Sequence, residues 1–225
     1  MIEEKNTPLL DSEISIKEKF KTLSTKKKVE FIYDYYKLPI IAVLLGIIII
    51  SYMVYSIATK QDTYCNITYY GSNAVSEELS TIKDTLNERL LSNDKKSSIF
   101  IESIFISPDS NYGDDPTSTQ AFAVKLAANE IDILLINKNY FNYFAAHDML
   151  LDLNSLTGFD SLNLTENDLI TAKNQSGNEN LYGIKINNLN LLKDASFDLD
   201  NTILAIAVSS QRNDQVLQVL KEFTK

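Results

Sequence analysis

The pattern of hydrophobic and polar positions divides the chain into one long uncharged stretch and a region of shorter, alternating segments. The stretch from Leu38 to Ala58 has 21 residues without a charge, and 12 of them are Leu, Ile or Val. A helix of this length spans about 31 Å, which matches the hydrocarbon thickness of a bilayer. The pattern therefore predicts a single transmembrane helix over residues 38–58, after a partly disordered tail (1–37) and before a folded domain (59–225).

Lysines are distributed unevenly around this predicted span. Only Lys60 follows it closely, and the next basic residue is Lys83. Cytoplasmic flanks carry the excess of Lys and Arg, so we expect the N-terminus in the cytoplasm and the domain outside the cell membrane. The lysines before the span are Lys21, Lys26, Lys27, Lys28 and Lys37.

A cleaved signal peptide is the alternative interpretation of the same stretch, because Ser56 and Ala58 are small residues at a plausible cleavage spacing. Two features favour a retained anchor. The apolar run is longer than the 7–15 residues of a signal-peptide core, and 37 residues precede it.

The remaining segments alternate between strand-like and helix-like patterns. Runs of β-branched, aliphatic and aromatic residues predict strands, and apolar positions three or four apart predict helices. Residues 148–180 are expected to be rich in loops. The predicted strands are Thr63–Tyr70, Ser98–Ile106, Ile131–Ile136 and Thr202–Val208, with an extended segment at Tyr182–Ile186. The predicted helices start at a cap on Ser72 or Asn73, at a capping box of Thr117 with Gln120, at a cap on Asn137, and before Val216.

This order predicts an α/β fold with one mostly parallel sheet flanked by helices. Ligands of such sheets bind outside the carboxyl ends of the strands. Tyrosines near those ends could also stack on a ligand such as a sugar, although core packing is their commoner role. The candidate residues for binding a ligand or partner are Tyr70, Gly71, Ser72, Asn137, Tyr140 and Ser209.

Composition excludes several kinds of chemistry. The segment from Thr59 onward has 13 basic and 23 acidic residues, a balance that argues against nucleic acid as a partner. One cysteine permits no internal disulfide, and one cysteine with one histidine leaves no zinc site. The loop from Pro108 to Pro116 holds four Asp or Asn residues, but their spacing fails the EF-hand pattern. No nucleotide-binding loop or activated nucleophile is present, so we expect no catalytic residue, metal or cofactor.

Several motifs occur in the order typical of one family. The segments TQAFAVKLAANEIDILLINKNYF (119–141), MLLDLNSL (149–156), LYGIK (181–185) and AIAVSSQRNDQVLQVLKEF (205–223) together resemble extracellular solute-binding proteins of ABC importers. The resemblance covers about half of the domain and implies a lobe of the periplasmic-binding-protein type. Only about 17 residues separate Ile186 from Thr202, where the family inserts a second lobe, which needs on the order of 50 residues. The chain is therefore expected to form one lobe.

Three functions remain open from the sequence. The first is a membrane-anchored extracytoplasmic binding or accessory module that resembles a reduced solute-binding protein. The second is a bitopic structural subunit whose helix docks on other membrane proteins, and the third, least favoured, is an enzyme. The expected partners are the membrane and another membrane protein such as a permease. An apolar groove near Tyr70 and Asn137 would favour the first function, and a closed, flat face would favour the second.

Overall fold

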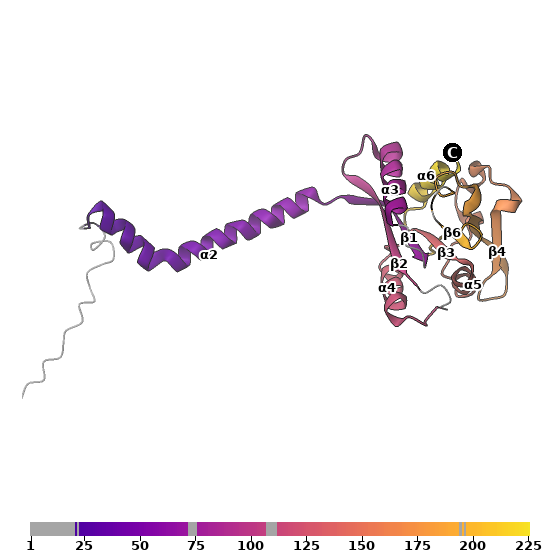
Figure 1. Ribbon diagram of the computed structural model, residues 1–225, viewed down its shortest axis with the longest axis horizontal. Coiled ribbons are helices and arrows are strands. Elements are labelled where there is room, and N and C mark those ends of the chain that lie inside the picture. Colours follow the sequence, from indigo (N-terminus) through magenta and orange to yellow (C-terminus); the bar gives the residue numbers. More distant parts are fainter. Residues whose placement is uncertain (1–20, 22, 72–75, 107–111, 194, 196) are drawn as a thin grey trace, which may run out of the picture. The chain divides into compact units, whose positions relative to one another are not determined.

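The computed structural model describes residues 21, 23–71, 76–106, 112–193, 195 and 197–225. The chain divides into two compact units, Met1–Lys60 and Gln61–Lys225 (Figure 1). Each unit is described below by itself.

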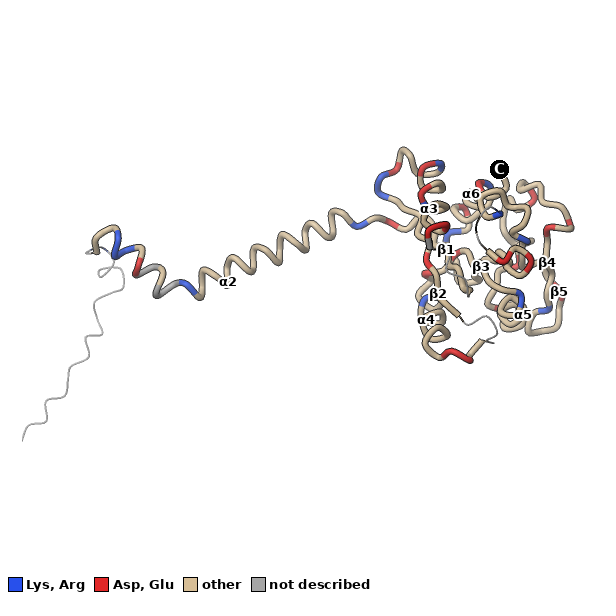
Figure 2. Tube along the Cα trace, in the orientation of Figure 1, with Lys and Arg blue, Asp and Glu red and all other residues tan. Residues whose placement is uncertain are grey.

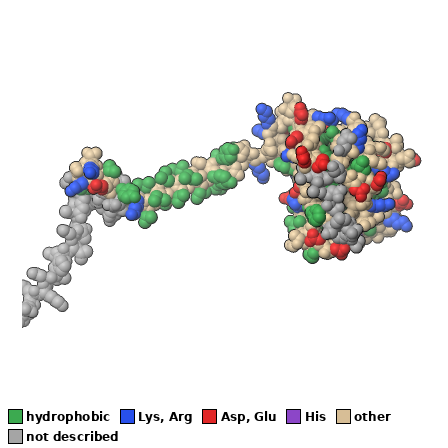
Figure 3. Space-filling model, in the orientation of Figure 1, with side chains coloured by type: hydrophobic (Ala, Val, Ile, Leu, Met, Phe, Trp, Pro, Cys, Tyr) green, Lys and Arg blue, Asp and Glu red, His purple; other side chains and the backbone are tan. Residues whose placement is uncertain are grey.

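The first unit contains one long helix, α2 (Thr25–Thr59). Its part from Lys37 to Thr59 is long and apolar enough to cross a membrane, and none of it is buried against the rest of the chain. Figure 3 shows hydrophobic side chains along this part of the helix. Pro39 lies inside α2, where it lacks the N–H that would bond to the preceding turn, so the helix has a built-in point of bending.

The second unit is a six-stranded sheet with helices on both faces (Figure 1). Its helices and strands follow one another in the order expected from the sequence, with one additional strand, β4. The elements are β1 (Asp62–Gly71), α3 (Ser76–Leu91), β2 (Ser97–Phe105), α4 (Pro116–Ala127), β3 (Ile133–Asn137), α5 (Lys138–Ala146), β4 (Leu169–Lys173), β5 (Glu179–Lys185), β6 (Thr202–Ile206) and α6 (Asn213–Thr224).

The strands lie in the order β2-β1-β3-β6-β5-β4. Strands β2 and β3 pair in parallel with β1, whereas β6 is antiparallel to both β3 and β5, and β4 is antiparallel to β5. Four of the six strands, namely β1, β2, β3 and β5, therefore point in the same direction. The predicted α/β fold with a mostly parallel sheet and flanking helices is confirmed, with β4 and β6 reversed.

The reversal of β6 overturns one expectation about the sheet's edges. We expected Ser209, which follows β6, to lie at the same edge as the ends of β1 and β3. Because β6 runs antiparallel to β3, its end lies beside the start of β3, where Ile206 pairs with Ile133. Ser209 therefore belongs to the opposite edge of the sheet from Asn137.

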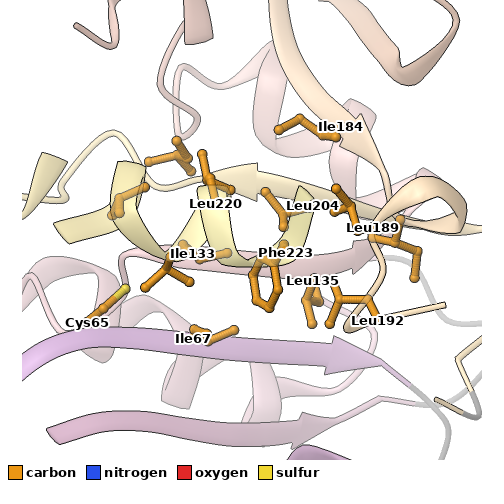
Figure 4. Close-up of a cluster of buried hydrophobic side chains, with 14 of the residues drawn as sticks. Cys65, Ile67, Ile133, Leu135, Ile184, Leu189, Leu192, Leu204, Leu220 and Phe223 are labelled. Carbon is orange, nitrogen blue, oxygen red and sulfur yellow. The ribbon is translucent and has the colours of Figure 1, made fainter. Parts of the chain in front are cut away.

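Each face of the sheet carries its own hydrophobic core. Helices α3 and α6 cover one face together with the segment between β5 and β6, and helices α4 and α5 cover the other. In Figure 4, Leu220 and Phe223 of α6 lie over side chains of β3 and β6. Burial of aliphatic and aromatic side chains on both faces is the main stabilising term of such a domain.

The segment between β5 and β6 adds to the first core instead of forming a lobe. It begins with a 3-10 turn, Ile186–Asn188, and buries Leu189, Leu192 and Phe197. The ring of Phe197 lies 5.2 Å from that of Tyr69 on β1. These contacts tie the segment to the sheet.

One local expectation was wrong, and one strand was not expected. Helix α4 is capped by Asp115, whose carboxylate accepts from the backbone N–H of Thr117 at 3.0 Å, with Pro116 as the first helical residue, so Thr117 and Gln120 form no capping box. Residues 148–180 are rich in loops and short 3-10 turns, as expected, but they also contain β4, which forms a hairpin with β5 around a turn at Gly177, whose φ is +82°. The caps predicted at Ser72 and Asn73 lie outside the described residues.

Candidate functional site

The candidate site lies at the edge of the sheet where β1, β2, β3 and β5 end. Strands β4 and β6 begin at the same edge because they run in the opposite direction. Asn137 at the end of β3 pairs with Thr202, and Lys185 at the end of β5 pairs with Ile203. Chain segments far apart in sequence therefore meet here.

The two tyrosines predicted at this edge belong to the core. Tyr70 and Tyr140 are 1% and 2% exposed, and their ring centroids are 5.0 Å apart in a T-shaped arrangement. Phe122 of α4 and Phe144 of α5 belong to the same cluster, stacked at 4.7 Å, and the ring of Tyr112 packs against both. Burial, and then the neighbouring Tyr140, raise the pKa of the Tyr70 phenol well above its usual range. Within the described part of the chain neither ring face is open to a ligand, so this part of the edge is closed to stacking on these rings.

Gly71 and Asn137 form local hydrogen bonds at the ends of β1 and β3. The Gly71 carbonyl accepts from the N–H of Ile106 at 3.0 Å, and a Cβ at Gly71 would meet the ring of Tyr69 at 2.3 Å. The Asn137 carboxamide oxygen accepts from the N–H of Tyr140 at 2.9 Å and so caps α5, as the sequence predicted. Ser72 lies outside the described residues.

Beside Asn137, a cavity of about 550 Å³ opens between α5 and strands β4, β5 and β6. Its floor is apolar, because Phe141 and Ile203 are buried and Ile170 is half-buried. Its volume falls in the usual range for ligand pockets, roughly 300–1,000 Å³. The lining residues are Lys138, Phe141, Asn142, Leu169, Ile170, Thr171, Lys185, Asn187, Leu199, Asp200, Thr202 and Ile203.

Unpaired polar groups surround the mouth of this cavity. The side chains of Lys138, Asn142, Lys185, Asn187 and Asp200 are all exposed. None of their ammonium, carboxamide or carboxylate groups makes a hydrogen bond or an ion pair with another described residue. Five exposed side chains without internal partners therefore surround the apolar floor, and each of them can bond to a ligand or a partner.

The ammonium of Lys185 influences the pKa of a nearby carboxyl at this edge. The pKa of the Asp168 carboxyl is lowered mainly by hydrogen bonds from Thr165 and Asn188, and further by the ammonium of Lys185. Asp168 closes a capping box with Thr165, whose N–H and hydroxyl both donate to it. This box fixes the chain just before β4, which forms one wall of the cavity.

A second polar cluster, at the opposite edge, was not predicted. Asp132 is fully buried; its carboxylate accepts from the Asn66 N–H at 2.8 Å and from the Ser210 hydroxyl at 2.7 Å. The guanidinium of Arg212 lies 3.2 Å away. The cluster joins β1, β3 and the turn after β6, and its partners lie so far apart in sequence that no local pattern reveals it. Ser209, in the same turn, has a buried hydroxyl with no hydrogen-bond partner among the described residues.

The chain's single cysteine and single histidine both make contacts within the fold. Cys65 is fully buried, and burial, together with the charge of Asp132, raises the pKa of its thiol well above the usual range, against a smaller opposing effect of Arg212. His147 ends α5, with Nδ1 2.7 Å from the Tyr143 carbonyl oxygen and its ring stacked on that of Tyr143. Among the described residues, no group of three or more His, Cys, Asp or Glu side chains is placed to hold a metal ion.

Comparison with known proteins finds a distant structural likeness and no family assignment. No protein-family model matches the chain, and no curated protein matches it. Among solved structures it is similar to "Extracellular solute-binding protein family 1" from Alicyclobacillus acidocaldarius subsp. acidocaldarius DSM 446, with a TM-score of 0.35 and 16% sequence identity. The match covers 56% of this chain and 28% of that one, so it spans little more than a quarter of that protein. A likeness of this size is too weak to assign a role to any residue of the site.

Proposed function

We propose that this protein is a single-pass, membrane-anchored extracytoplasmic module that binds another membrane protein through the edge of the sheet around Asn137, and that it catalyses no reaction. The observation that carries the proposal is the cavity beside Asn137, with its apolar floor and unpaired polar mouth. Each part of the proposal rests on separate features of the chain.

The membrane anchor is supported by α2. Its stretch from Lys37 to Thr59 has the length and composition of a membrane span. Figure 2 marks basic residues near the start of α2 and both acidic and basic residues along the domain. The lysines before the span favour a cytoplasmic N-terminus, which would place residues 61–225 outside the cell.

A protein partner fits the cavity better than a free solute does. Ligand pockets bury roughly 70–90% of a small ligand's surface. This cavity is bounded by one lobe only, and the side chains around its mouth, including Lys138, Asn142 and Lys185, are exposed. A partner that covers the mouth would supply the missing wall. Since the order of sequence motifs resembles that of solute-binding proteins, a permease is the first partner to look for.

The closed part of the same edge favours a second candidate function. Tyr70 and Tyr140 are buried, so among the described residues neither ring lines an open groove. A structural subunit that docks through its membrane helix would need no groove. The two functions differ in which unit holds the partner.

Purification of the protein from membranes, followed by identification of what co-purifies, distinguishes these two functions. The full chain should retain a membrane protein that a version ending at residue 60 loses, because the domain makes the contact. Asn142→Trp, which places a large side chain at the cavity mouth, should also lose it. Ser176→Trp, in the exposed turn between β4 and β5 at the opposite edge, is the matched control and should keep it. Retention of the partner by residues 1–60 alone would favour the structural subunit.

A further inference from the structure

We propose that the cavity beside Asn137 takes an acidic peptide segment, in which a carboxylate side chain meets Lys138 and Lys185 and a neighbouring aliphatic side chain rests on the apolar floor. This inference rests on the proposed function, since it names the chemistry of the partner at the same site. Three observations support it.

The first observation is the charge around the mouth. Two ammonium groups, those of Lys138 and Lys185, line the cavity with only one carboxylate, that of Asp200. The segment from Thr59 onward has 23 acidic and 13 basic residues, so a net positive opening contrasts with the rest of the domain. Because neither ammonium has an ion-pair partner among the described residues, a carboxylate can approach without displacing one. Charge-assisted hydrogen bonds to carboxylates are about twice as strong as neutral ones.

The second observation is the floor. Phe141 comes from α5, Ile203 from β6 and Ile170 from β4, and these side chains form an apolar surface below the polar mouth. A Cβ at Gly183 would lie 2.7 Å from a methyl carbon of Ile203 and 2.8 Å from the ring of Phe141, so the residues of the floor are already tightly packed. An apolar floor favours an aliphatic group beside the carboxylate over a fully hydrated anion.

The third observation is the wall formed by β4. Three consecutive residues of this strand, Leu169, Ile170 and Thr171, line the cavity, so the strand's backbone borders it. Within the described part of the chain, β4 is one of the two outermost strands of the sheet, the other being β2, and it pairs only with β5. An edge strand offers unpaired N–H and C=O groups that an extended peptide can bond. An extended peptide could continue the sheet along β4 while its side chains reach the cavity, which a free organic acid cannot do.

Binding of short peptides by the full chain in phosphatidylcholine nanodiscs tests the inference. The probe is a capped pentapeptide with a central Glu between two Val residues, and its control is the same peptide with Gln. Saturation-transfer NMR measures both dissociation constants, with empty nanodiscs as the blank. We expect roughly millimolar binding, with the Glu peptide bound about fivefold more tightly than the Gln peptide.

Variants assign the preference to the cavity. In Lys138→Gln/Lys185→Gln the Glu preference should fall below about twofold, whereas Lys173→Gln, which removes an exposed charge at the opposite edge, should leave it unchanged. A preference that also disappears in Lys173→Gln would overturn the assignment.

Two other results would overturn the inference itself. One is equal binding of the two peptides by the unaltered chain. The other is binding of free glutarate at least as tight as that of the Glu peptide, because the site would then serve a small solute. Failure of the peptide to bind, with loss of the membrane partner still caused by Asn142→Trp, would reject this chemistry and leave the proposed function standing.

Discussion

Both carboxylate oxygens of Asp132 lie within 3.3 Å of one guanidinium nitrogen of Arg212, which is 80 residues further along the chain. Asp132 is completely buried, and Arg212 is about a third exposed. The pair joins β3 to the turn that leads into α6. A buried charge that loses its partner is strongly destabilising, so we expect removal of the Arg212 charge to lower the stability of the domain.

We expect Arg212→Met to lower the free energy of unfolding by about 3 kcal/mol, because it leaves the buried Asp132 carboxylate without its counter-charge. Urea unfolding of residues 60–225 measures this, since the second unit is expected to fold cooperatively alone. Lys83→Met breaks an exposed ion pair with Asp84 and should change stability by less than about 0.5 kcal/mol. Equal effects of the two substitutions would show that the buried pair has no special role.

Cys65 should report unfolding of the domain. It is the chain's only cysteine, it is fully buried, and burial raises the pKa of its thiol. A thiol reagent at pH 7.5 should therefore label the native chain at least about a hundredfold more slowly than the urea-unfolded chain. Fast labelling of the native chain would contradict the buried position.

The same thiol gives a pH dependence with a definite sign. Its pKa is higher in the folded than in the unfolded chain, where it is about 8.5. The stability that Cys65 contributes is therefore fully present below about pH 8.5 and declines as the pH rises above that value. Urea unfolding at pH 7.5 and 9.5 should show a smaller alkaline loss for Cys65→Ala than for the unaltered chain, and an identical loss would contradict the shift.

Local patterns in the sequence were sufficient to place most elements of the domain. The runs that became β1, β2, β3 and β6 are dense in β-branched and aromatic residues, and the Asn137 cap of α5 follows from residue type alone. Strand β4 was missed because its side chains are half-buried or exposed, and its register with β5 shifts at Ile170, so it lacks a regular alternation.

The site itself was only partly predictable. Strand direction decides which residues share an edge, and no local pattern carries the direction of β6, so Ser209 was assigned to the wrong edge. The lysines that line the cavity looked like ordinary surface residues in the sequence. They meet because β3 and β5 lie on either side of β6 and end at the same edge, which is a property of the whole sheet.

Protease accessibility tests the proposed orientation in the membrane. Protease added to intact protoplasts should digest the segment after Lys60 and leave the N-terminal tail, because the lysines before the span favour the cytoplasmic side. Antibodies against epitope tags at the two ends distinguish the products. Protection of the C-terminal tag before lysis, with loss of the N-terminal one, would reverse the topology.

Free solutes should bind weakly to the isolated domain. The segment between β5 and β6 packs into the core, so the described chain has no second lobe to close over the cavity. Isothermal titration of residues 60–225 with sugars, amino acids and short peptides should show no micromolar binding, since one side of each ligand stays in water. A single clear micromolar ligand would restore a solute receptor.

The most direct test of the central claim is site-specific photo-crosslinking in intact membranes. A benzophenone side chain at Asn142 or Asn187 lies at the cavity mouth, and the same group at Ser176 lies in the turn between β4 and β5 at the opposite edge. If the edge around Asn137 binds a membrane protein, both mouth positions should give the same adduct of higher mass, and Ser176 should give none. Adducts from Ser176 alone, or none from either mouth position while a partner still co-purifies with the full chain, would contradict the account.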